Sequence, residues 1–183
     1  MDKKVVVTGC AGFIGYHLSN TLLDDDKTVI GIDSLNNAYD IKLKQKRLEE
    51  LEKKENFVFL NNNLNEQDSL NEIKNYEIST IYHMAARAGV RQSFLDPQSY
   101  IEDNTFATAN ISNFSKQMEI PELILASYHG IPKKHFDKGD PYHCYCHTTT
   151  RLISEKFNSI EIKTTFQSRF GPQEWLQPYT DKT

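Results

Sequence analysis

Three glycines, Gly9, Gly12 and Gly15, lie between a valine-rich stretch and an amphipathic stretch early in the sequence. Glycines in this context permit a sharp turn from strand to helix, a close approach of the backbone to a pyrophosphate, and close packing of the helix on the sheet. Amide groups at the start of such a helix face the phosphates. The pattern therefore predicts a dinucleotide cradle, and a glycine-rich turn without a ligand is the alternative.

An acidic residue, Asp33, ends the next apolar stretch. A carboxylate at this position can accept hydrogen bonds from the ribose hydroxyls of adenosine. Because the same negative charge would repel a 2′-phosphate, the sequence predicts NAD rather than NADP as the cofactor.

The elements that must position these residues follow from the alternation of short apolar runs with longer periodic segments. This pattern is typical of an α/β fold with a doubly wound parallel sheet of the Rossmann type, here with a hybrid C-terminal βα extension. Ile14, Leu18 and Leu22 are expected to turn the first helix onto the sheet. Strands are expected over Lys4 to Thr8, Thr28 to Asp33, Phe57 to Asn61, Thr80 to Ala85, Glu122 to Ser127 and Thr164 to Phe170, and helices over Gly12 to Leu23, Asp40 to Lys53, Glu66 to Lys74, Pro97 to Lys116 and Pro141 to Phe157.

The composition argues against several classes of function. A net charge of −4 gives no electrostatic reason to expect a nucleic acid or an anionic membrane as partner. No apolar run reaches the roughly 20 residues of a membrane-spanning helix, and no leader segment is recognised, which predicts a cytoplasmic protein. The three cysteines are an odd number and do not suggest a disulfide framework. The basic run from Lys42 to Arg47 is interpreted as a solvated helix face.

Further motifs join the glycine turn, namely Ile32 to Asp40, His83 to Arg91, and Asn104. With them, residues 1–127 strongly resemble the extended short-chain dehydrogenase/reductase family, and within it the NAD-dependent UDP-glucuronate 4-epimerases. The resemblance implies that the pyrophosphate is held by Gly9, Gly12, Phe13, Ile14 and Gly15, the ribose by Asp33, the adenine by Asn63 and Leu64, and the nicotinamide side by Ala85, Ala86 and Arg87. The family usually has Asp at the position of Asn63.

The catalytic pair of that family is not recognised in this sequence. In the family, a Tyr-x-x-x-Lys pair transfers a proton while hydride moves to NAD, because the lysine ammonium lowers the pKa of the tyrosine. None of the nine tyrosines is followed by lysine at this spacing. The sequence therefore predicts NAD binding without epimerisation by the usual route.

The second part of the sequence contains Ser127 to Pro132, Gly139 to Tyr142, and Thr165 to Thr180. From Leu123 to Thr183 the chain resembles ferrochelatase, which inserts ferrous iron into protoporphyrin in heme biosynthesis. The resemblance implies that His129 is the active-site histidine, which accepts pyrrole protons or escorts the metal. A neutral imidazole suits both tasks.

The ferrochelatase machinery is also expected to be incomplete, because a later segment of that family supplies a glutamate opposite the histidine. An inherited loop histidine without activity is therefore the alternative for His129. His143 and His147 are four residues apart and would share a helix face, a geometry that can bind a transition metal. A polar helix face with partly buried thiols, from Cys144 and Cys146, is the alternative to such a metal site.

The expected organisation is a Rossmann domain over residues 1–127 and a ferrochelatase-like fragment over residues 128–183 that packs onto the same sheet. Three functions remain open: an NAD-binding epimerase-like protein, a ferrochelatase-like protein, both without complete catalytic machinery, and a recombinant chimera with no selected function. The epimerase-like protein would be related to isomerases, and the ferrochelatase-like protein would be related to lyases. The expected ligands are NAD, a nucleotide sugar or a porphyrin, with iron as substrate metal in the ferrochelatase reading. The oligomeric state is not predicted.

Overall fold

The structure is a computed structural model, and it describes residues 3–38, 40–66, 68–87, 90–125, 128–155, 163–167, 169 and 171–179. The chain divides into two compact units, Met1–Ile124 and Leu125–Thr183. The division falls inside the stretch Leu123 to Ser127, where the two family resemblances overlap. Among the described residues, no helix has both the length and the apolar character needed to span a membrane.

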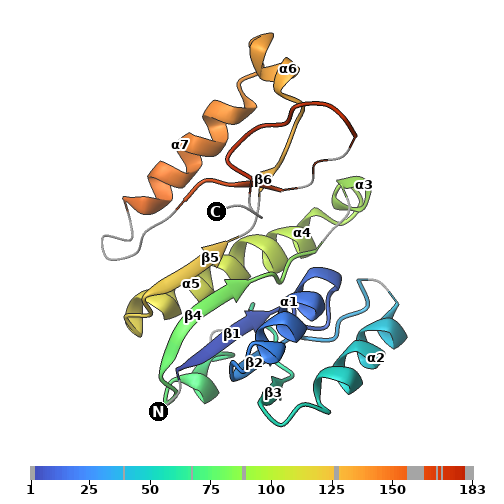
Figure 1. Cartoon of the computed structure of the whole chain (residues 1–183), viewed down its shortest axis with the longest axis vertical. Helices are drawn as coiled ribbons and strands as arrows, with labels where there is room; N and C mark the ends of the chain where they lie inside the picture. Colours follow the sequence, from blue (N-terminus) through green and yellow to red (C-terminus); the bar gives the residue numbers. More distant parts are fainter. Residues whose placement is uncertain are drawn as a thin grey trace. The chain divides into compact units, whose positions relative to one another are not determined.

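The first unit is built on a five-stranded sheet with the order β3-β2-β1-β4-β5 (Figure 1). β1 pairs in parallel with β2 and with β4, and β2 pairs in parallel with β3. This is the strand order of a doubly wound Rossmann sheet, so the predicted fold class is confirmed. The strands are β1 (Lys4–Thr8), β2 (Val29–Ile32), β3 (Phe57–Leu60), β4 (Ile78–His83) and β5 (Glu122–Leu125).

The helices of the first unit mostly follow the predicted segments. They are α1 (Phe13–Asp24), α2 (Ile41–Leu51), the 3-10 turn η1 (Asn71–Ile73), α3 (Val90–Ser93), α4 (Pro97–Tyr100), the π-helical segment η2 (Ile101–Phe106) and α5 (Ala107–Gln117). The Asp40 side chain caps α2 by accepting a hydrogen bond from the Lys42 amide. The expected helix over Glu66 to Lys74 is reduced to η1 in the described part of that segment, and the expected helix from Pro97 contains the π-helical segment.

The predicted stripe of α1 is confirmed at Leu18 and Leu22, which are partly buried against the core, but not at Ile14, whose side chain is 54% exposed. The fully buried residues of the helix are Gly15, Ser19 and Leu23. The reason is that Gly15 packs directly against the backbone of the glycine turn, which rotates the helix so that this residue faces inward. Leu23 joins a core formed with strands β1 and β2 and with helix α2.

The second unit contains β6 (Tyr128–His129), α6 (Lys133–Asp137), α7 (Tyr142–Ser154) and β7 (Phe166–Gln167). β6 and β7 pair in parallel in a separate two-stranded sheet. The prediction that the strand near Thr164 to Phe170 extends the larger sheet is therefore wrong. The two-residue strand β6, which lies in none of the predicted strands, provides the edge to which β7 bonds. Cys146, Phe166 and Leu176 form the core of this unit.

Candidate functional site

The glycine turn after β1 has a backbone geometry that larger residues would disrupt. Gly9 has φ of +68°, and a Cβ atom there would lie 2.8 Å from the backbone of Ala85. A Cβ atom at Gly15 would lie 2.1 Å from the carbonyl oxygen of Gly9. The Gly9 amide donates to the Ile32 carbonyl at 2.7 Å, which ties the turn to the end of β2. The predicted close packing of helix on sheet therefore has a direct steric basis at Gly15.

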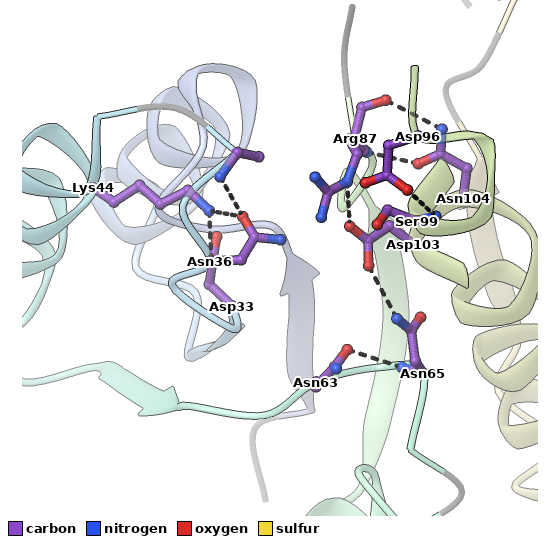
Figure 2. Close-up of polar contacts among 11 residues, drawn as sticks. Asp33, Asn36, Lys44, Asn63, Asn65, Arg87, Asp96, Ser99, Asp103 and Asn104 are labelled. Carbon is purple, nitrogen blue, oxygen red and sulfur yellow. Dashed lines mark hydrogen bonds and ion pairs between the residues drawn. The ribbon is translucent and has the colours of Figure 1, made fainter. Parts of the chain in front are cut away.

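Asp33 follows β2 and is buried beside this turn. The Ala11 amide donates to its Oδ2 at 3.2 Å, and the Leu35 amide donates to its Oδ1 at 2.8 Å. Lys44 Nζ lies 3.3 Å from the same Oδ1. Figure 2 shows Lys44 reaching from α2 toward Asp33 and Asn36. The carboxylate predicted to bind ribose is therefore held in place by two backbone donors and one ammonium group.

Lys44 is a part of this site that the sequence analysis missed. The side chains of Lys44 and Asp33 are only 7% and 5% exposed, and Lys44 Nζ also donates to Asn36 Oδ1 at 3.0 Å. The interpretation of the Lys42 to Arg47 run as a solvated face is thus wrong at Lys44. The spacing of Lys44 in the sequence could have indicated this burial, because Lys44 lies on the buried stripe of α2 together with Leu48 and Leu51.

A second polar group involves Arg87, after β4, and the π-helical segment η2 (Figure 2). Arg87 Nε donates to Asp103 Oδ2 at 2.7 Å, and the Arg87 amide donates to Asn104 Oδ1 at 2.6 Å. Asp103 Oδ1 in turn accepts from Asn65 Nδ2 at 3.0 Å. The contacts join three segments that are distant in the sequence. π-Helical segments occur frequently at functional sites.

A cavity of about 330 Å³ opens beside both groups. Of the residues predicted from the epimerase resemblance, the cavity is lined by Gly9, Gly12, Asp33, Asn63, Leu64, Ala85 and Ala86. Phe13, Ile14, Gly15 and Arg87 are not among the lining residues. The lining also includes residues that were not predicted, namely Asn36, Lys44, Asn65 and Asp103. The structure thus brings most of the predicted site residues together around one cavity.

The cavity fits part of a dinucleotide on two observations besides its size. The backbone at Gly9 forms a cradle that a side chain would fill. Asn65 Oδ1 is buried and has no hydrogen-bond partner among the described residues, so a ligand donor would satisfy it. Buried polar atoms are nearly always paired, and exceptions often mark sites.

Two further groups near the turn are structural rather than reactive. Burial, and secondarily the charge of Asp33, raise the pKa of the Cys10 thiol far above its usual range. Burial lowers the pKa of His83 to about 4. The Thr108 hydroxyl donates to the Asn104 carbonyl, so its oxygen accepts from His83 Nε2 at 3.1 Å, while Nδ1 contacts the Thr8 hydroxyl at 2.8 Å. His83 is therefore a neutral, fully bonded link between β1, β4 and α5.

In the second unit, His129 is exposed at the end of β6. Its Nδ1 lies 2.6 Å from the Gly130 carbonyl oxygen. Because a carbonyl only accepts, Nδ1 carries a proton, and in the neutral ring Nε2 therefore has the free lone pair. The Tyr142 hydroxyl donates to the His129 carbonyl at 2.9 Å. Within the described part of the chain, no three His, Cys, Asp or Glu side chains are grouped so that they could hold a metal ion.

The strand order and the glycine turn beside a buried Asp33 define the class of the first unit as an α/β Rossmann-type unit. The chain is 41% identical to a UDP-glucuronate 4-epimerase of Thermodesulfobacterium geofontis, a match that covers 75% of this chain and 42% of that protein. A mutant UDP-glucuronic acid 4-epimerase of Bacillus cereus, solved with NAD and a fluorinated UDP-sugar, superimposes with a TM-score of 0.63 and 32% identity over 68% of this chain and 40% of its own.

The other comparisons concern the later part of the sequence. The ferrochelatase family matches residues 65–183, and the chain belongs to this family. A ferrochelatase of Rhizobium meliloti is 50% identical over 90 residues, which are 46% of this chain and 26% of that protein. The chain is thus chimeric, epimerase-like in its first part and ferrochelatase-like in its last, and it spans less than half the length of these curated relatives.

Proposed function

We propose that the first unit binds NAD in the cavity beside the glycine turn. The observation that carries this proposal is the buried Asp33, which two backbone amides and Lys44 hold beside Gly9 and Gly12. A carboxylate accepts about four hydrogen bonds, so Asp33 keeps acceptor capacity for ribose beyond the three donors described. Gly12, at the start of α1, would approach the pyrophosphate.

NAD rather than NADP remains the proposed cofactor, but the preference rests on hydrogen bonding more than on charge repulsion. Lys44 neutralises part of the Asp33 charge, so repulsion of a 2′-phosphate is weaker than a lone carboxylate would produce. The hydrogen-bond pattern still favours a ribose hydroxyl, because a hydroxyl can donate to Asp33 and an ionised phosphate cannot. We therefore expect NADH to bind more tightly than NADPH by about tenfold, equivalent to roughly 1.4 kcal/mol.

The same unit is proposed to bind the cofactor without epimerase turnover. When bound, NAD supplies a hydride acceptor, but the proton must be moved by a protein group. Every tyrosine of the sequence lacks a lysine four residues later. His83 is no substitute as a base, because both of its ring nitrogens are engaged by Thr8 and Thr108.

The test is a titration of the full chain with NADH, followed by nicotinamide fluorescence. We expect a saturable enhancement and blue shift, and we expect Gly12→Asp to abolish it by placing a negative side chain in the phosphate approach. Thr148→Asp is the matched control, because Thr148 is exposed on α7 of the second unit and the substitution adds the same negative charge. The absence of a saturable change at millimolar NADH would refute the proposal.

A second candidate function is a ferrochelatase-like reaction at His129, supported by the family match and by the free lone pair on Nε2. That nitrogen could take a pyrrole proton or bind ferrous iron as substrate metal. The test incubates the chain with protoporphyrin and ferrous iron under reducing conditions. Metallation at the same rate as in His129→Ala would eliminate this candidate.

A further inference from the structure

Two histidines on α7 lie with their ring nitrogens directly facing one another. His143 Nε2 and His147 Nε2 are 3.2 Å apart, and the ring centroids are separated by 4.4 Å. Residues four apart on a helix share one face, so the backbone of α7 places the pair. With no cation bound, the nitrogens at this distance share one proton in a hydrogen bond.

The orientation of the His143 ring is held by aromatic side chains from two other elements. It stacks on Phe166 of β7 with an interplanar angle of 18°, and it contacts Phe136 of α6 with ring centroids 4.9 Å apart. His147 also contacts Phe166, at 6.2 Å between centroids. Because the His143 ring is packed between two rings, little side-chain entropy is left to lose when a ligand binds.

We propose that His143 and His147 form a two-histidine site for a divalent transition metal of the borderline class, such as Ni²⁺, Cu²⁺ or Zn²⁺. Imidazole nitrogens lie about 2.0–2.1 Å from such metals, so two of them bound at an angle between about 90° and 109° are about 2.8–3.4 Å apart. The observed 3.2 Å separation lies in this interval. One ion can therefore replace the shared proton after only small ring movements.

The remaining coordination positions would be filled by water. The described residues offer no third His, Cys, Asp or Glu placed to complete a protein-only shell, and His147 is exposed to solvent. Burial, followed by the neighbouring His147, lowers the pKa of His143. Neutral imidazole is a preferred ligand of these metals.

The test is isothermal titration of the full chain with Ni²⁺ alone, near neutral pH. We expect the parent chain to bind one Ni²⁺ ion at this site. His147→Gln should lower the affinity for this ion by at least about tenfold, because the loss of a residue that only supports a metal ligand already costs that much. His135→Gln, on exposed α6, is the matched control and should bind Ni²⁺ like the parent chain. Unchanged affinity in His147→Gln would overturn the proposal.

Two more variants separate this site from its neighbours. Cys144→Ser should leave the Ni²⁺ affinity within about twofold of the parent chain, because Cys144 does not belong to the pair. If Cys144→Ser removes binding while His147→Gln retains it, the metal is bound elsewhere and the proposal fails. His143→Gln provides a second readout: Ni²⁺ should raise the melting temperature of the parent chain but not of this variant.

Discussion

Replacing Lys44 by methionine removes one partner of the buried ion pair with Asp33 while preserving most of the volume and the helix propensity of α2. At the observed separation of 3.3 Å, with an effective dielectric constant of about 20, the lost attraction is about 5 kcal/mol. Part of this loss is offset, because Asp33 keeps hydrogen bonds from the amides of Ala11 and Leu35. We therefore expect Lys44→Met to lower the free energy of unfolding by about 3 kcal/mol.

The assay is urea denaturation followed by far-ultraviolet circular dichroism. Lys46→Met is the matched control, because Lys46 is exposed on the same helix, and its cost should stay within about 0.5 kcal/mol. Emission of Trp175, the single tryptophan, follows the second unit separately. The reasoning is refuted if Lys44→Met and Lys46→Met cost the same, or if a cycle with Asp33→Asn gives no coupling between Asp33 and Lys44.

Two other perturbations address the same unit. Gly15→Ala should lower the free energy of unfolding by about 3 kcal/mol and abolish the NADH signal, because its Cβ would lie 2.1 Å from the Gly9 carbonyl. A loss under 1 kcal/mol in urea denaturation would contradict this. The pKa of His83 is lowered by burial to about 4, against about 6.5 unfolded, so the unfolded chain binds more protons between these values. Stability should therefore fall by roughly 3 kcal/mol from pH 6.5 to pH 4, and His83→Gln should flatten that profile.

Among the described residues, two hydrophobic clusters each lie within one unit of the chain. One core joins β1 and β2 to the helices α1 and α2, and the other joins α7 to β7 around Cys146 and Phe166. Each unit therefore buries apolar surface from its own segments.

The sequence by itself determined the features that depend on local spacing. The glycine turn, the five strands of the first unit and the position of Asp33 after β2 were all predicted, because apolar periodicity and glycine placement act over a few residues. Of the residues predicted to hold the pyrophosphate, Gly9 and Gly12 line the cavity. Local rules were sufficient here because neighbouring residues in the chain supply the determining contacts.

Only the tertiary structure decided which polar side chains are buried and which strand edges are paired. Lys44 looked solvated in a basic run, yet it is buried against Asp33. Asn65, Arg87 and Asp103 meet only because segments distant in the sequence pack together. β7 bonds to the two-residue strand β6, whose length gives almost no periodic signal. Long-range packing determines the partner in each of these contacts, and local spacing indicated at most that Lys44 lies on the buried stripe of α2.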